Sequence, residues 1–217
     1  MYTPPVFKTT DATAWAFVAE RGFGTLIVST NGCPAASHLP FVVTPAAAGA
    51  PARLEMHVAR ANPLHGLAGD GSPALLVVTG PDAYISPDWY DSADQVPTWN
   101  YVSVHLNGTL RALPADEALA HVDRLSAAFE ARLEPKRPWT SAKMTPARRA
   151  AMLKAIVPLE FTVTSLEAQW KLAQHKTVAD RQQVARMLDW RGDHNSMQVA
   201  RLMLGSLDPR PRASMAA

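Results

Sequence analysis

Short stretches in which apolar and polar residues alternate recur along this chain. Arg53 to Ala59 is the clearest of them, with apolar side chains at its even-numbered positions and polar or charged ones between them. Because successive side chains of a strand point to opposite faces, this alternation predicts a strand with one face in a core. The same pattern predicts strands at Trp99 to Asn107 and from Leu159 to Val163.

Three further strands are predicted from apolar runs rich in branched residues. Phe23 to Thr30 and Pro34 to Val43 flank Asn31-Gly32, a dipeptide that favours a tight hairpin because both positions tolerate positive φ. Ala74 to Thr79 is the third run, and Gly80-Pro81 is expected to end it in a loop. Several antiparallel strands at close spacing indicate a small barrel, since closure removes the free edges that invite aggregation.

Helices are predicted at three places. Asp11 precedes an amphipathic stretch from Ala12 to Arg21, which Gly22 follows where a C-terminal cap belongs. A helical insertion at about 113–157 separates the last two strands, and Thr145-Pro146 is expected to start the second helix in it. Thr177 begins a capping pattern that opens a helical tail at about 177–217. The expected fold is therefore mainly β with helical elaborations (α+β), in one domain over residues 1–217.

Composition and charge exclude few functions. The chain has 217 residues, 47% of them hydrophobic and 18% charged, and a formal net charge of +2, too small an excess to indicate a dedicated nucleic-acid binder. No apolar run reaches the roughly 20 residues of a membrane helix, and the N-terminus lacks the regions of a signal peptide. Together with a single cysteine, Cys33, these features predict a cytoplasmic protein without a membrane segment.

Motifs for common chemistries are missing. The seven histidines include no close pair on one helix and no cysteine cluster beside them, so no metal site is expected. There is also no Gly-x-Ser-x-Gly elbow, Walker loop or dinucleotide fingerprint. Hydrolase and nucleotide-kinase activities therefore have no support, and no catalytic residue can be assigned.

Aromatic rings, prolines and hydroxyls gather between Tyr84 and Tyr101, on segments that connect strands. Rigid rings with polar tips suit the wall of a site for a flat ligand, although a well-packed loop explains them equally well. Arg60 and Asn62 come where a predicted strand ends, beside the expected free amides of a short helix, and such donors suit a phosphate monoester. A surface arginine followed by Asn62-Pro63 as a simple helix start explains the same residues. Lys171 lies at another strand end, where it either meets a phosphate or stays solvated.

Several motifs, taken in order, resemble the PaiB family of FMN-binding negative transcriptional regulators, which are relatives of the pyridoxamine 5'-phosphate oxidase-like split barrels. The motifs are Met1-Tyr2-x-Pro4, Ser37-His38-Leu39-Pro40-Phe41, His57-Val58-Ala59-Arg60-Ala61-Asn62-Pro63, Gly80-Pro81, Tyr84-Ile85-Ser86-Pro87 with Trp89-Tyr90, Val96-Pro97-Thr98-Trp99-Asn100-Tyr101, and Trp170-Lys171-Leu172 with Gln174. Around that glutamine the family usually has serine and asparagine, whereas this chain has Ala173 and His175.

The resemblance implies a six-stranded antiparallel split β-barrel that forms a homodimer with FMN at the interface. It implies flavin contacts along one strand and at the phosphate end, from Ser37, His38, Leu39, Pro40, Ala59, Arg60 and Asn62. It also implies that Trp99, Asn100 and Tyr101 close the site, with Lys171 as a further contact.

Three functions remain open from the sequence. The first is a PaiB-type FMN-binding regulator that acts on nucleic acid directly or indirectly. Direct binding to nucleic acid would use a basic cluster in the insertion, formed by Lys136, Arg137, Lys143, Arg148 and Arg149. A solvated basic surface explains this cluster as well. The second is a flavin-dependent oxidoreductase or flavin reductase, in which the cofactor carries the redox step. The third is a haem-binding split barrel.

Overall fold

The computed structural model describes residues 1–29, 33–47, 49–69 and 71–205. Its chain divides into two compact units. The barrel unit comprises residues 11–78 and 104–167. The second unit comprises residues 1–10, 79–103 and the chain from 168 onward.

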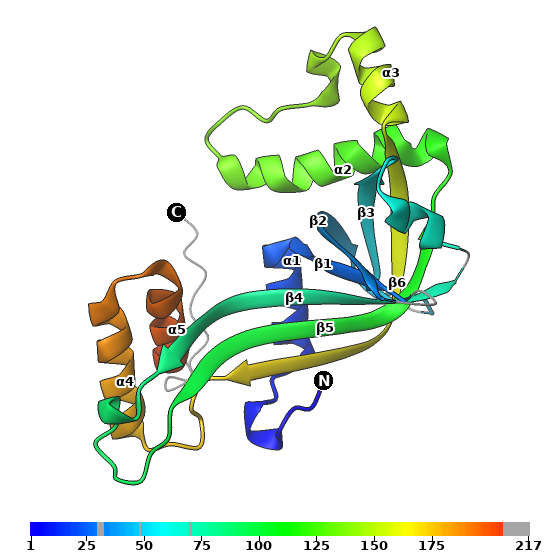
Figure 1. Ribbon diagram of the computed structural model, residues 1–217. Helices are drawn as coiled ribbons and strands as arrows, with labels where there is room; N and C mark the ends of the chain where they lie inside the picture. The colour runs from blue at the N-terminus through cyan, green and yellow to red at the C-terminus, as the bar shows by residue number, and fades with distance from the viewer. Residues whose placement is uncertain (30–32, 48, 70, 206–217) are drawn as a thin grey trace. The chain divides into compact units, whose positions relative to one another are not determined.

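Six strands form a closed barrel (Figure 1). They are β1 (Phe23–Val28), β2 (Ala35–Thr44), β3 (Arg53–Ala59), β4 (Ser72–Ile85), β5 (Thr98–Ala112) and β6 (Ile156–Lys171). Their order around the barrel is β1-β2-β3-β6-β5-β4, and the pairs β1–β2, β1–β4, β2–β3 and β3–β6 are antiparallel. The predicted six-stranded antiparallel barrel is confirmed, and the Asn31-Gly32 turn lies outside the described residues.

Apolar side chains at alternate positions of the strands fill the barrel interior, as the sequence pattern predicts. Leu54 and Met56 of β3 are fully buried, and they pair with Phe161 and Leu159 of β6, which are buried too. Burying a side chain of this size contributes roughly 1.5–3 kcal/mol relative to its exposure, so these positions supply much of the stability of the barrel. At Gly108 of β5 the strands approach so closely that an added Cβ would lie 2.1 Å from the backbone oxygen of Thr162.

The described residues form five α-helices, with short 3₁₀ turns between elements. The α-helices are α1 (Asp11–Arg21), α2 (Ala118–Glu130), α3 (Pro146–Lys154), α4 (Val178–Arg191) and α5 (His194–Gly205). The 3₁₀ turns are η1 (Pro5–Phe7), η2 (Pro63–Leu67), η3 (Pro87–Trp89), η4 (Ala115–Glu117), η5 (Ala131–Leu133) and η6 (Ser141–Lys143). None of the described helices is long and apolar enough to cross a membrane.

Two predictions about elements need correction. The Gly80-Pro81 dipeptide does not end a strand, because β4 continues through it to Ile85. A proline is tolerated there because β1 pairs with β4 only from Ala74 to Val77, so an amide at position 81 would have no β1 carbonyl to donate to. The C-terminal segment holds two helices rather than one, since Gly192 adopts a left-handed φ of 72° after α4 and α5 begins at His194.

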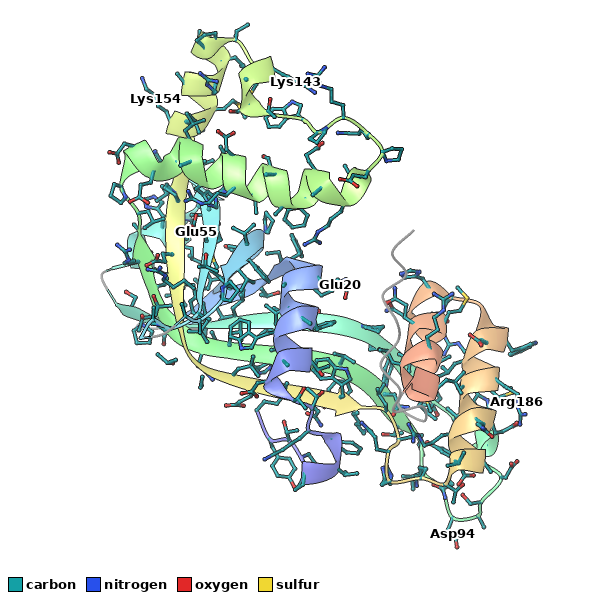
Figure 2. All side chains as sticks on the ribbon, turned by 180° about the vertical axis from the view of Figure 1, so that it is seen from behind. Glu20, Glu55, Asp94, Lys143, Lys154 and Arg186 are labelled. Carbon is teal, nitrogen blue, oxygen red and sulfur yellow. The ribbon has the colours of Figure 1, made fainter. Side chains whose placement is uncertain are left out.

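In the barrel unit, α2 and α3 lie between β5 and β6, in the segment expected to be a helical insertion. Thr145 caps α3 as predicted, because its side chain accepts a hydrogen bond from the amide of Arg148. Helix α2 packs against β2 and β3. This contact brings α2 side chains to the outer face of β3, where Glu55 (labelled in Figure 2) lies.

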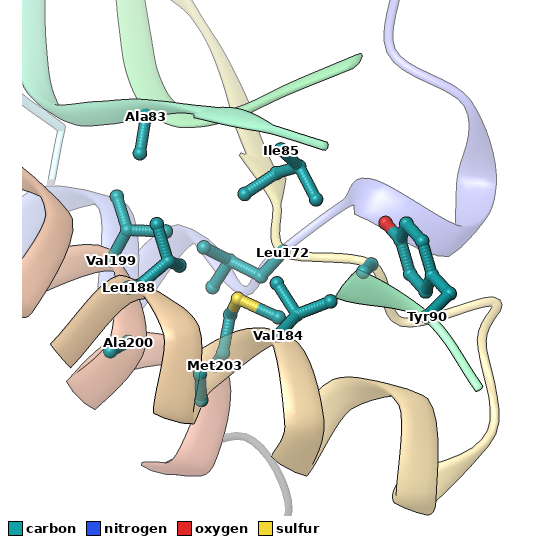
Figure 3. Close-up of a cluster of buried hydrophobic side chains, with 11 residues drawn as sticks. Ala83, Ile85, Tyr90, Leu172, Val184, Leu188, Val199, Ala200 and Met203 are labelled. Atoms are coloured by element: carbon teal, nitrogen blue, oxygen red, sulfur yellow. The ribbon is translucent and has the colours of Figure 1, made fainter. Parts of the chain in front are cut away.

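The second unit has its own apolar core (Figure 3). Helices α4 and α5 pack together, and Val184, Leu188 and Val199 from them meet Ile85 at the end of β4. Thr177 caps α4 through the amide of Asp180, as its sequence pattern predicts. This core fixes the end of β6 and the loop after it, which carry Lys171 and its neighbours.

Candidate functional site

Two of the motifs expected at the flavin meet in the barrel unit. Asn62 follows β3 and Ser37 lies on β2, and the Asn62 side-chain amide donates a 2.8 Å hydrogen bond to the Ser37 hydroxyl oxygen. The Asn62 carbonyl oxygen caps η2 by accepting from the Leu64 amide at 2.9 Å. Asn62 is therefore held at both ends of its side chain, and Ser37 retains its hydroxyl hydrogen as a donor.

Arg60 lies two residues before Asn62, at the end of β3. Its Nε donates to the carbonyl of Lys154 at 2.8 Å, and one terminal nitrogen donates to the carbonyl of Ile156 at 3.0 Å. Among the described residues, the other terminal nitrogen has no protein partner, so one fork of the guanidinium stays available. The expected free amide at the start of η2 is not available, because Asn62 itself caps Leu64.

The other predicted contacts in the barrel unit differ in accessibility. His38 is exposed, and its Nδ1 lies 2.8 Å from the hydroxyl oxygen of Thr25 on β1. Leu39 is buried in the core, so only its backbone can face a ligand, whereas Pro40 is half-buried. Ala59 is exposed and accepts the backbone amide of Asn62 at 2.8 Å. Alternation on β2 thus places Ser37 away from the exposed face of His38.

The second unit contains a cavity of about 290 Å³ at the ends of β5 and β6. Asn100 and Lys171, both predicted flavin contacts, line it. The Lys171 ammonium donates to the hydroxyl of Thr98 at 2.7 Å, and burial lowers the pKa of Lys171. Asn100 is almost fully buried. The cavity is therefore a mostly apolar hollow with a positioned cation.

Two residues that were not predicted as contacts also line this cavity, and one of them adds a positive charge. Lys176 lines it with its ammonium 5.4 Å from the centre of the Tyr90 ring, a cation–π contact. His175 also lines it, and burial, followed by the nearby Lys176 and Lys171, lowers the pKa of His175. The only sequence signal for this cluster is the run of basic residues after β6. An anion in the cavity would relieve the repulsion between the ammonium groups of Lys171 and Lys176.

Trp99 and Tyr101 do not line that cavity. They flank Asn100 on β5, and because side chains alternate along a strand they face the opposite side of the sheet. Trp99 is 52% exposed and meets Tyr84 edge to face, with 6.1 Å between ring centres. The aromatic wall predicted from the sequence thus exists as a Tyr84–Trp99 pair on the other face of the sheet from Asn100.

A polar chain that sequence reasoning missed lies in the barrel unit. His57 of β3 and His121 of α2, 64 residues apart, meet with 2.9 Å between His57 Nδ1 and His121 Nε2. His121 is completely buried, and its Nδ1 lies 3.4 Å from a carboxylate oxygen of Glu55, which Arg124 holds at 2.6 Å. Burial, followed by the charge on His57, lowers the pKa of His121 to about 4. Only the packing of α2 on β3 creates this pair, so spacing alone could not reveal it.

The depressed pKa of His121 predicts how stability depends on pH. Because the unfolded chain binds a proton near pH 6.5 and the folded chain only near pH 4, the free energy of unfolding should fall as the pH drops between these values. In denaturant titrations at several pH values, the free energy of unfolding of His121→Gln should fall less with decreasing pH than that of the wild type. His194 is exposed, so the control variant His194→Gln should show the same change of unfolding free energy with pH as the wild type. If His121→Gln also shows the wild-type change, the depressed pKa of His121 is contradicted.

Comparison with known proteins places these features in a family. A family model described as "Putative FMN-binding domain" matches residues 1–165. The chain is also 33% identical over 213 residues to "Protease synthase and sporulation protein PAI 2" of Bacillus subtilis (strain 168), a match that covers 94% of this chain and 96% of that protein.

Solved structures agree on the fold. The FAD and heme binding protein of Mycobacterium smegmatis matches with a TM-score of 0.53 and 18% identity, over 76% of this chain and 72% of that one. The flavocytochrome Anf3 of Azotobacter vinelandii matches with a TM-score of 0.51 and 16% identity, over 76% and 69%. At these identities the likeness concerns the barrel alone. The family match and the PAI 2 relative together show that the chain belongs to the PaiB-type family of FMN-binding split-barrel proteins, which confirms FMN as the predicted cofactor.

Proposed function

We propose that this chain is a cytoplasmic, homodimeric FMN-binding protein with a regulatory role, and that Arg60 and the Ser37–Asn62 pair hold the phosphate end of the flavin. The observation that carries the placement is the 2.8 Å hydrogen bond between Asn62 and Ser37. It joins two motifs that lie 25 residues apart and that the family resemblance assigns to one ligand. The ring of FMN then runs along Ser37 to Pro40 on β2.

The donors in this group fit a phosphate monoester. The Ser37 oxygen accepts from Asn62, so its hydroxyl hydrogen points elsewhere and can donate to a phosphate oxygen. The guanidinium of Arg60 uses two of its three nitrogens on carbonyl groups of Lys154 and Ile156, which fixes its plane. The third nitrogen offers a charge-assisted donor in a fixed orientation. Bound FMN would supply redox chemistry, while these residues only hold and orient it.

The remaining predicted contacts, which are Trp99, Asn100, Tyr101 and Lys171, are proposed to complete the flavin site of the dimer. Tyr84 and Trp99 support a further contact surface, because the single chain leaves them 40% and 52% exposed. Large exposed aromatic side chains in a group are typical of surfaces that bind a partner or a ligand.

Absorption spectra and light scattering test this proposal. Purified protein mixed with FMN should bind one flavin per chain, show a flavin and not a porphyrin spectrum, and have the mass of a dimer. The loaded protein should oxidise reduced nicotinamide no faster than free FMN, as expected for binding or sensing rather than catalysis. A monomer without bound flavin would refute the proposal, and rapid nicotinamide oxidation would favour the oxidoreductase.

The regulatory role is proposed to be indirect with respect to DNA. Of the five basic residues in the insertion, Lys136 pairs with Glu130, Lys143 donates to the carbonyl of Pro138, and Arg149 donates to that of Ser141. The Glu130 carboxylate neutralises Lys136, so the insertion has fewer unpaired charges for phosphate groups than the sequence suggests.

DNA affinity should therefore be weak and nearly the same in wild-type protein and in an Arg137→Gln, Arg148→Gln double variant. The measurement is fluorescence anisotropy of a labelled duplex at 50 and 200 mM salt, since phosphate contacts would make the affinity fall by orders of magnitude between them. A steep salt dependence that the double variant reduces would establish direct binding.

A further inference from the structure

The helical insertion of the barrel unit contains a cavity of about 210 Å³. None of the residues proposed to hold FMN lines it. Its walls are mostly apolar, formed by Val122, Trp139, Met144, Met152, Leu153 and Ile156. A space of this size, below the usual range for drug-sized ligands, suits a molecule with a single ring.

One polar wall of the cavity is His57, whose protonation is set by its neighbours. The carboxylate of Glu55 lies 3.4 Å from His121 Nδ1, which favours a proton on that nitrogen. His121 Nε2 then accepts a hydrogen bond from His57 Nδ1 across 2.9 Å. The remaining nitrogen of His57, Nε2, is therefore left without a proton, so His57 offers the cavity a hydrogen-bond acceptor.

The other polar wall carries a positive charge. Arg149 of α3 lines the cavity and is half-buried, and its side chain makes one long hydrogen bond, 3.4 Å, to the carbonyl of Ser141. Most of its five donors stay available for a ligand. Among the residues that the structure describes, Arg149 and His57 are the only charged or titratable ones that line the cavity, and no carboxylate lines it.

We propose that this cavity binds a small aromatic hydroxy acid. Its carboxylate would pair with Arg149, its hydroxyl group would donate to His57 Nε2, and its ring would lie between Trp139 and the methionine and leucine side chains. Because Glu55, His121 and His57 form one chain from the surface of β3 to the cavity, a ligand there would also fix how α2 packs on the barrel. This site goes beyond flavin binding and does not depend on it.

Calorimetry on the full-length, FMN-loaded protein tests the proposal with 4-hydroxybenzoate, benzoate and phenol as probes. We expect 4-hydroxybenzoate to bind tightest, and loss of either its hydroxyl or its carboxylate group to weaken binding about 10-fold or more. Arg149→Gln should weaken 4-hydroxybenzoate about 10-fold while leaving phenol unchanged. The matched control is Arg148→Gln, because Arg148 is exposed on the same helix and does not line the cavity.

A second variant keeps the test independent of Arg149. Leu153→Trp should fill the cavity and abolish binding of all three probes while FMN affinity stays at the wild-type value. The proposal is overturned if no probe binds at millimolar concentration. It is equally overturned if Arg149→Gln and Leu153→Trp both bind 4-hydroxybenzoate like the wild type.

Discussion

Replacing Gly108 with alanine should destabilise the barrel by at least about 3 kcal/mol or prevent folding. A Cβ at this position would lie 2.1 Å from the oxygen of Thr162 and 2.8 Å from the ring of Phe161. The first of these atoms belongs to the backbone of β6, so relief requires the two strands to separate. Since β5 and β6 are neighbours in the closed barrel, that separation would open the core.

Urea titration of Gly108→Ala against the wild type measures this effect. Gly66→Ala is the matched control, because nothing lies within 4 Å of a Cβ added there. The control should unfold within about 0.5 kcal/mol of the wild type. Equal unfolding midpoints for Gly108→Ala and the wild type would show that β5 and β6 do not approach each other this closely at Gly108.

Replacing Arg60 with alanine should weaken FMN binding by about 1.5–3 kcal/mol, or roughly 10- to 150-fold. The variant loses a charge-assisted donor to the phosphate, and Asn62 and Ser37 remain to bind the rest of the ligand. Fluorescence titration of FMN measures the change. Arg60→Lys should recover part of the loss, because it restores the charge without the planar fork.

The control for Arg60→Ala is Arg53→Ala. Arg53 also lies on β3, but at its other end, where its side chain is 47% exposed and its guanidinium is 3.9 Å from a carboxylate oxygen of Glu160. FMN affinity in Arg53→Ala should equal that of the wild type. Unchanged affinity in a folded Arg60→Ala protein would show that the phosphate binds elsewhere, and Lys171 of the second unit would be the next candidate.

The sequence predicts the barrel well because its signals are local. Alternation between Arg53 and Ala59 gives the bounds of β3 without error, and Thr145 and Thr177 mark helix starts because capping depends on residues only three positions away. The prediction of a loop at Gly80-Pro81 was wrong, because the continuation of β4 depends on its neighbouring strands and not on the local sequence. Whether a proline can stay in a strand depends on which edge lacks a partner, and that follows from where β1 stops pairing.

The candidate site was only partly predictable for the same reason. The motifs around Ser37 and Asn62 predict a shared ligand, but their contact depends on how β2 and η2 fold together. The His57–His121 pair carries no signal at all, since its members are 64 positions apart and His121 lies within the helical insertion. Burial and partner geometry, which create the depressed pKa of His121, are properties of the folded core rather than of any stretch of sequence.

A crystal structure of the protein grown with excess FMN tests the central claim most directly. The account predicts two copies of the chain with one flavin per chain at their interface, the phosphate within hydrogen-bond distance of Arg60 and the Ser37 hydroxyl, and the ring along residues 37–40. A monomer, or a dimer whose interface is filled by side chains and leaves no space for FMN, would contradict it.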